Sequence, residues 1–91
     1  MAVGYVRGMV VNVDLPRLDA TGGWKERPAL IVSTEDFHRT RPNDLLVALI
    51  TYRAWKYRSS TNYLIQDWQA AGLTQLSVVR SSLYLLTLFP E

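Results

Sequence analysis

The chain has 91 residues, 48% of them hydrophobic and 20% charged, with a formal net charge of +2, which fits one folded domain over residues 1–91 and excludes a disordered chain. No apolar run approaches the about 18 residues that a membrane span needs and no secretory signal is recognisable, so we expect a cytoplasmic protein without a membrane partner. With no cysteine and a single histidine, His38, the chain offers neither a thiolate site nor a zinc set, so we expect no metal and no other cofactor.

Six segments have the short apolar or alternating patterns of β-strands. In chain order, we expect strands over Val6–Leu15, Ala29–Ser33, Asp44–Thr51, Thr61–Ile65, Leu76–Val79 and Leu83–Phe89. The first is rich in valine and is expected to stop at Pro16, which cannot donate to a ladder. Strands this short and this regularly spaced, with no long helix, predict a mainly β fold, a small barrel or rolled sheet of five to six strands.

The connections between these strands carry turn and helix signals. Residues 17–26 contain the pair Gly22-Gly23 and are expected to form a long loop, a frequent location for function on small β scaffolds. A helical turn is expected around Glu35–His38, where Ser33 or Thr34 can cap it. Gln66–Gly72 has helix formers followed by a glycine suited to a left-handed C-terminal position, so we expect one or two helical turns there.

Positive charge is concentrated between Arg39 and Arg58, where five cations stand against one carboxylate, Asp44. A local basic excess of this kind is typical of a surface that binds phosphates, and it also occurs on solvated loops. The stretch Tyr52–Ser59 alternates aromatic and cationic residues. The candidates for phosphate binding and base stacking in it are Arg53, Trp55, Lys56 and Arg58, of which Trp55 is equally suited to a dimer interface.

The familiar catalytic motifs are missing, because the sequence has no Gly-rich phosphate loop, no HExxH, no paired CxxC and no GxSxG. Cations and hydroxyls suffice, however, for attack of an RNA 2′-hydroxyl on its adjacent phosphodiester, since the nucleophile is already in the substrate. Arg27 lies just before Pro28 and a buried strand, where its guanidinium can donate two hydrogen bonds to phosphate oxygens. Alternatively, it is a surface arginine that caps the strand. Thr51 ends the most apolar strand, where a rigid element would hold its hydroxyl.

Four groups of residues occur in a fixed order along the chain. They are Arg7–Val11 (RGMVV) with Val13–Pro16 (VDLP), then Lys25–Ser33 (KERPALIVS), then Leu46–Thr51 (LVALIT), then Asp67-Trp68 with Ala71–Leu73 (AGL) and Ser77–Arg80 (SVVR). This ordered set resembles the MazF/PemK family of toxin endoribonucleases from bacterial type II toxin–antitoxin systems. The resemblance implies an SH3-like barrel, a homodimer and a cognate antitoxin. It also implies metal-independent cleavage of single-stranded RNA to a 2′,3′-cyclic phosphate and a 5′-hydroxyl, which inhibits translation and growth.

The resemblance further implies roles for individual residues. Arg27 corresponds to the family's arginine in the RP motif and would stabilise the transition-state phosphate. Thr51 corresponds to the threonine or serine that ends the next strand and would orient the phosphate or the 2′-hydroxyl. Arg80 corresponds to a later arginine that takes part in PemK-like members. The loop after the first strand lies over the RNA in this family, so Trp24 and Lys25 are expected to contact RNA, although Trp24 could instead anchor the loop against the barrel.

Three features depart from the family pattern. PemK-like members place an acidic residue two positions after the later arginine, and this sequence has Ser82. The loop's usual GxE pattern is replaced by ATGGWKE, which leaves Glu26 as a displaced candidate for proton transfer, with His38 as another. Most members continue into a final helix, whereas this sequence ends at Glu91, so the resemblance is to a chain lacking that helix, either a short natural variant or a truncated one. These departures keep open a second interpretation, a catalytically impaired barrel that binds RNA or a peptide.

Overall fold

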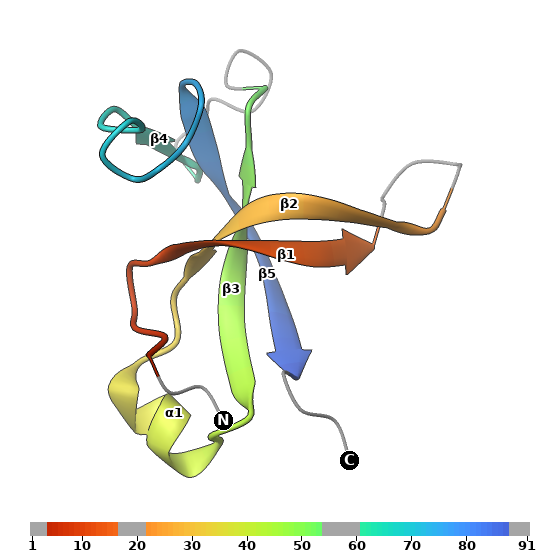
Figure 1. The fold of residues 1–91 in the computed structure, drawn as a ribbon, viewed down its shortest axis with the longest axis vertical. Helices are drawn as coiled ribbons and strands as arrows, with labels where there is room; N and C mark the ends of the chain where they lie inside the picture. Colours follow the sequence, from red (N-terminus) through yellow and green to blue (C-terminus); the bar gives the residue numbers. More distant parts are fainter. Residues whose placement is uncertain (1–3, 17–21, 54–60, 88–91) are drawn as a thin grey trace.

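The computed structural model describes residues 4–16, 22–53 and 61–87. Within them, five strands form one antiparallel sheet in the order β1-β2-β3-β5-β4 (Figure 1). The elements are β1 (Val10–Pro16), β2 (Trp24–Ile31), α1 (Glu35–Thr40), β3 (Asp44–Thr51), β4 (Tyr63–Ile65) and β5 (Ser77–Thr87). The predicted mainly β fold of five to six strands is confirmed. A helix with the length and apolarity to cross a membrane does not occur in the described part of the chain.

β3 is the central strand, with β2 on one side and β5 on the other. Its bounds are those expected from the sequence, because the apolar run Leu45–Ile50 leaves no polar residue at which an earlier end could occur. Val47 and Ala48 are both buried, although successive side chains of a strand project to opposite faces. β3 is therefore covered on both faces of the sheet.

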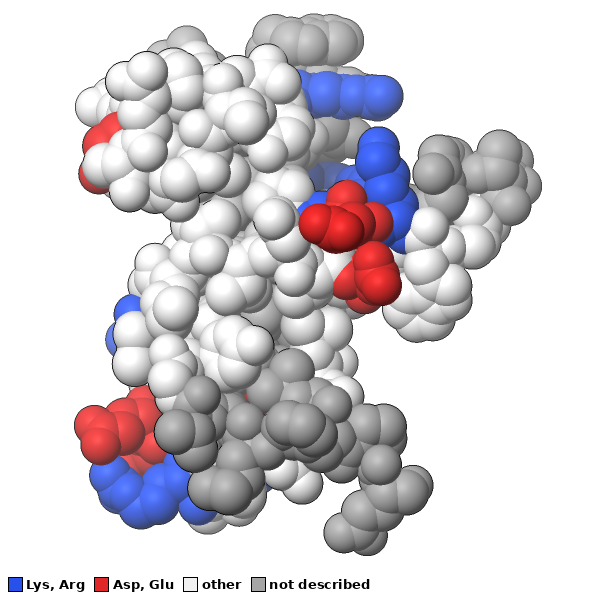
Figure 2. Space-filling view, viewed as in Figure 1, with Lys and Arg blue, Asp and Glu red and all other residues white. Residues whose placement is uncertain are grey.

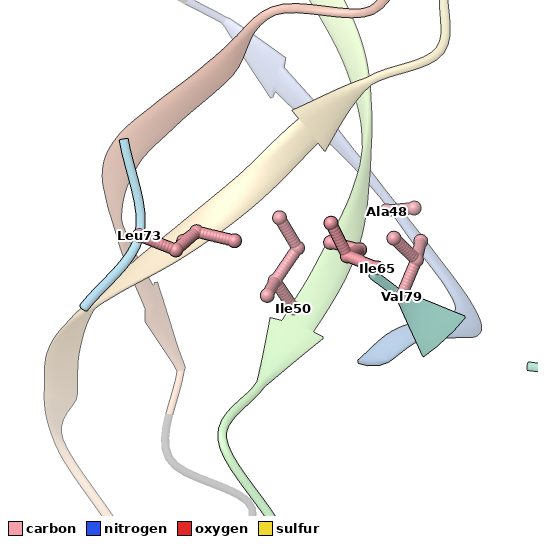
Figure 3. Packing of buried hydrophobic residues seen from close by; sticks show 5 residues of the cluster. All are labelled: Ala48, Ile50, Ile65, Leu73 and Val79. Carbon is pink, nitrogen blue, oxygen red and sulfur yellow. The ribbon is translucent and has the colours of Figure 1, made fainter. Parts of the chain in front are cut away.

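The apolar side chains form two clusters, and adjacent β3 residues belong to different ones. The first consists of Ala29, Ile31, Leu45 and Val47, with Val11, Val13, Tyr84 and Leu86 packed against it. The second consists of Ala48, Ile50, Ile65, Leu73 and Val79, whose side chains point toward one another in Figure 3. Because strand side chains alternate between faces, the two clusters lie on opposite faces of β3.

The direction of the backbone bonds of β2 explains where it separates from β3. The Val32 N–H donates to the Leu46 carbonyl at 2.9 Å, on the β3 side, whereas the Ile31 N–H donates to the Met9 carbonyl at 2.9 Å, on the β1 side. Alternate residues of a strand bond to opposite neighbours, so Pro28 faces β3. Proline has no N–H, and it cannot donate a bond to β3 at this position.

The pairing pattern follows from this missing donor. Pairs between β2 and β3 end at Ala29↔Leu49, although both strands continue beyond it. Pairs between β2 and β1 continue to Pro16↔Trp24. The β1–β2 hairpin consequently extends away from β3, while β3 remains paired with β5 (Figure 1).

Helix α1 begins where the sequence predicts. The hydroxyl of Thr34 accepts a hydrogen bond from the Phe37 N–H at 3.3 Å, which caps the helix. Glu35 and Asp36 occupy the first turn, where carboxylates interact favourably with the helix dipole. The helix continues to Thr40, two residues past the expected turn, and α1 joins β2 to β3.

The first two strand boundaries differ from the expectation. β1 begins at Val10 rather than Val6, because Gly8 has a positive φ of 95° and the Met9 N–H closes a turn onto the Val6 carbonyl at 3.2 Å. The expected loop 17–26 is also shorter, since β2 already begins at Trp24. The two glycines before it, with φ of 65° and 76°, mark the turn, and the residues after them pair with β1.

The second half of the chain also brings corrections. The segments Leu76–Val79 and Leu83–Phe89, expected as two strands, are joined in one continuous strand, β5, which begins at Ser77 and is described as far as Thr87. The expected helical turns at Gln66–Gly72 are consecutive turns rather than a regular helix. Gly72 does have the left-handed conformation predicted for it, with a φ of 83°. The expected fourth strand is confirmed over Tyr63–Ile65.

Candidate functional site

Arg27 and Thr51 lie on the two strands that diverge, each two residues beyond the Ala29↔Leu49 pair. Side chains alternate along a strand, so both project from the face that carries Ala29 and Leu49. Both are half-buried. Thr51 remains paired with Val78 of β5, and Arg27 remains paired within the β1–β2 hairpin. The two residues singled out from the sequence therefore face the same side of the point where the sheet divides.

Arg80 comes to the same face from β5. It lies two residues after Val78, the partner of Thr51, and it is half-buried. The register of β5 against β3 shifts here, and the three residues Arg80–Ser82 stand opposite Leu49 alone. This is a β-bulge, a feature that redirects side chains and is frequent beside active sites. We refer to Arg27, Thr51 and Arg80 together as the Arg27 corner.

The polar atoms of the Arg27 corner are suited to an anionic ligand. The Nε atom of Arg27 is buried and has no hydrogen-bond partner among the described residues, whereas buried polar groups are nearly always paired. The hydroxyl of Thr51 accepts the Arg53 N–H at 3.2 Å, and its own hydrogen is not used in that bond. A phosphate could accept from both residues, and a guanidinium–phosphate bond is among the stronger protein hydrogen bonds.

The other sequence candidates lie around this corner in different ways. Lys25 follows the alternation of Arg27 and adds an exposed cation to the same face of the hairpin, and Arg53 is exposed two residues after Thr51. Trp24 is 70% exposed and alternates with Lys25, which places it on the opposite face of the hairpin. Figure 2 shows acidic and basic side chains side by side on this hairpin. The remaining candidates, Trp55, Lys56 and Arg58, lie outside the described residues.

The two candidates for proton transfer are not brought to the Arg27 corner. Glu26 projects from the opposite face of the hairpin, where it stands directly across from Asp14. His38 is on α1, before the start of β3, and β3 spans roughly 23 Å at about 3.3 Å per residue before it reaches Thr51. Among the described strand residues, the face that carries the Arg27 corner has no carboxylate and no imidazole.

The start of β3 has a different polar cluster, which we call the α1 end: Ser33, His38, Arg41 and Asp44. The buried hydroxyl of Ser33 is hydrogen-bonded to His38 Nε2 at 2.6 Å and accepts the Leu46 N–H at 3.1 Å. Arg41 Nε donates to Asp44 Oδ2 at 2.8 Å. From the sequence, Ser33 is expected as the end of a strand and as a possible helix cap, and its hydrogen bond to His38 is an additional contact that the structure reveals.

The fold and the site define a small antiparallel β protein in which arginine and threonine side chains face the point where two strands diverge. A family model of PemK-like, MazF-like toxins of type II toxin–antitoxin systems matches residues 6–84, which include β1 to β4 and most of β5. The chain belongs to this family, and the resemblance drawn from its sequence is confirmed. No curated protein matched the chain.

Proposed function

We propose that this toxin-family chain is an endoribonuclease that cleaves single-stranded RNA in the cytoplasm and thereby inhibits translation and growth. The observation that carries the proposal is the buried Nε of Arg27, without a hydrogen-bond partner among the described residues, on the face it shares with Thr51 and Arg80. A phosphodiester supplies acceptor oxygens for such a set of donors. Family membership supports the same activity.

In the proposed reaction the 2′-oxygen of one nucleotide bonds to the adjacent phosphorus, and the bond from phosphorus to the 5′-oxygen breaks. The 2′-hydroxyl loses a proton and the leaving 5′-oxygen gains one, so the products are a 2′,3′-cyclic phosphate and a 5′-hydroxyl. The guanidinium groups of Arg27 and Arg80 stabilise the charge on the non-bridging oxygens. Thr51 donates its hydroxyl hydrogen to the phosphate and so orients it for in-line attack.

The proton transfers are assigned to solvent water. Among the described strand residues, the face of the Arg27 corner carries no carboxylate or imidazole, and Ser82 occupies the position where the family resemblance leads us to expect an acidic residue. The protein would therefore contribute positioning and electrostatic stabilisation more than general acid–base catalysis.

The proposed partners follow from charge and size. An acidic antitoxin segment would compete with RNA for Lys25, Arg27 and Arg53, because all three are cations on or beside the same face. A chain of this size buries only about 60 to 65% of its unfolded surface, so a second copy would add to a thin core. Leu83 and Leu85 of β5 are 54% and 50% exposed, and we propose that they contribute apolar surface to a homodimer.

The test is incubation of the purified protein with a long single-stranded RNA in the presence of EDTA, followed by mapping of the new 5′ ends. We expect cleavage that leaves 5′-hydroxyl ends and that falls strongly in Arg27→Ala and less strongly in Thr51→Ala. Arg39→Ala, which changes an exposed arginine on α1, is the matched control and should cleave like the wild type. Absence of cleavage, or equal cleavage by all four proteins, would contradict the proposal.

A second candidate function is favoured by Ser82 and by the lack of a carboxylate on the described part of this face. In that case the chain is a catalytically impaired barrel that binds RNA or a peptide. RNA binding that depends on Arg27, without any cleavage, is the result expected for this alternative.

A further inference from the structure

The bulge in β5 sets the position of Arg80, one of the three side chains of the Arg27 corner. Arg80–Ser82 stand opposite Leu49 alone, so the regular ladder cannot hold all three residues. A bulge bends its strand and changes the direction in which side chains project. The shape of this bulge therefore helps to set the orientation of Arg80.

A side chain from outside the strand provides that restraint. The Oδ1 atom of Asn62 accepts the Ser81 N–H at 3.0 Å. Asn62 directly precedes β4, and the pairing of β4 with β5 ends at Tyr63↔Val79. Just beyond the last backbone pair, the side-chain amide of Asn62 thus takes the place of a strand carbonyl as the acceptor.

We infer that Asn62 is a positioning residue for RNA cleavage, acting on Arg80 through the β5 bulge; this inference rests on the proposed function. Asn62 is half-buried and bonds the backbone of the residue that follows Arg80. Thr51 is held separately, through its pair with Val78. Loss of the Asn62 bond therefore changes the angle at which Arg80 meets the phosphate and leaves Arg27 and Thr51 in place.

The test is a double-mutant cycle on RNA cleavage with Asn62→Ala, Arg80→Ala and the double variant. We expect Asn62→Ala to lower kcat roughly tenfold with KM changed by less than about twofold, and to have almost no effect once Arg80 is replaced. Asn62→Asp keeps an acceptor oxygen at the same place and should retain at least about a third of the wild-type kcat. Asn12→Ala changes an exposed asparagine on β1 and is the matched control, expected to match the wild type.

Equal losses from Asn62→Ala in the wild-type and Arg80→Ala backgrounds would overturn the inference, because Asn62 would then act independently of Arg80. A wild-type rate in Asn62→Ala or in Arg80→Ala would also overturn it and would leave the proposed function, carried by Arg27, standing. An inactive wild-type protein would instead refute the proposed function before any variant is compared.

Asn62→Ala could also fail to fold, which circular dichroism would detect. Asn62→Ser then takes its place, since its hydroxyl is one bond too short to reach the Ser81 N–H while the position stays polar. The expected result is the same roughly tenfold loss of kcat and the same dependence on Arg80. A wild-type rate in Asn62→Ser would overturn the inference.

Discussion

Arginine and hydroxyl side chains lie around both ends of β3, but their hydrogen bonding differs between the two ends. At the α1 end, Ser33 is bonded to His38 and to a backbone N–H, and Arg41 is paired with Asp44. At the Arg27 corner, the buried Nε of Arg27 has no partner among the described residues. Figure 2 shows charged side chains over both α1 and the β1–β2 hairpin, so charge alone does not distinguish the two ends.

Hydrogen-bond satisfaction, rather than residue type, therefore separates structural polar groups from those suited to a ligand. Polar groups that complete one another stabilise the fold, because a buried donor or acceptor left alone is costly. An unpaired buried donor on a rigid strand gains from a ligand that brings the missing acceptor. We therefore attribute stability to the α1 end and propose the Arg27 corner as the RNA-binding site. The following substitutions test this difference between the two ends.

The largest effect is expected for Arg27→Ala. The cleavage rate should fall by roughly 10²–10³-fold, because removal of one preorganised donor to a transition-state oxyanion has an effect of that size. The free energy of unfolding should not decrease. Arg27→Lys should not restore the rate, because an ammonium cannot form the planar fork of a guanidinium. Initial rates on the mapped RNA and urea unfolding measure the two quantities. A large loss of stability in Arg27→Ala would show that this residue stabilises the fold. The two ends of β3 would then not differ in the way described above.

The next effect is expected at the α1 end. Ser33→Ala leaves His38 and the Leu46 N–H without their shared partner, so we expect the free energy of unfolding to fall by about 1 to 3 kcal/mol. Urea unfolding provides the measurement. At temperatures where the variant is folded, its cleavage rate should equal that of the wild type. A reduced rate in fully folded Ser33→Ala would mean that the two ends of β3 are coupled.

A smaller effect is expected for Thr51→Val, which keeps the shape of the side chain and removes the hydroxyl. Cleavage should fall about tenfold, which corresponds to the loss of one hydrogen bond to a charged group of about 1.5 kcal/mol. Thr51→Ser, which retains the hydroxyl, is the matched control and should stay close to the wild type. Single-turnover cleavage rates of both variants provide the measurement. Equal rates in the valine and serine variants would show that the Thr51 hydroxyl takes no part in cleavage.

The smallest effect is expected for Arg41→Ala. Arg41 forms an ion pair with Asp44, and 53% of the Arg41 side chain is exposed. Solvent screening therefore limits the contribution of this pair to the free energy of unfolding to about 0.2 to 1 kcal/mol. Asp44 keeps a second partner, because the Thr87 hydroxyl donates to its Oδ1 at 3.0 Å. Thermal unfolding at low and high salt measures the change, and a loss well above this range would show that the α1 end is more tightly coupled than its exposure indicates.

Several features of the fold and of the candidate site could be predicted from the sequence, because they depend on local patterns. The apolar run that forms β3 and the cap at Thr34 required only the order of neighbouring residues. Arg27 and Thr51 were also identified as candidates, from their positions beside apolar strands and from the family resemblance. In each case the signal lay within about ten residues of the chain.

The arrangement of the site could not be predicted, because it depends on pairing between distant segments. Whether Pro28 faces β1 or β3 is decided by the register of β2, and a shift by one residue would reverse it. The bulge at Arg80 looks like a strand break in the sequence, since Ser81 and Ser82 interrupt the apolar pattern. The sequence predicts Trp24 in a loop because the pair Gly22-Gly23 is a turn signal, whereas β2 begins directly after these glycines.

The most direct test of the central claim is the NMR signal of the Arg27 Nε–H during titration with an oligonucleotide that has a 2′-deoxy nucleotide at the mapped cleavage position and cannot be cut. We expect this signal to shift on binding, because the Nε–H gains a phosphate acceptor, while the signals of Ser33, His38 and Arg39 stay unchanged. A saturating oligonucleotide that leaves the Arg27 Nε–H signal unchanged would contradict the central claim.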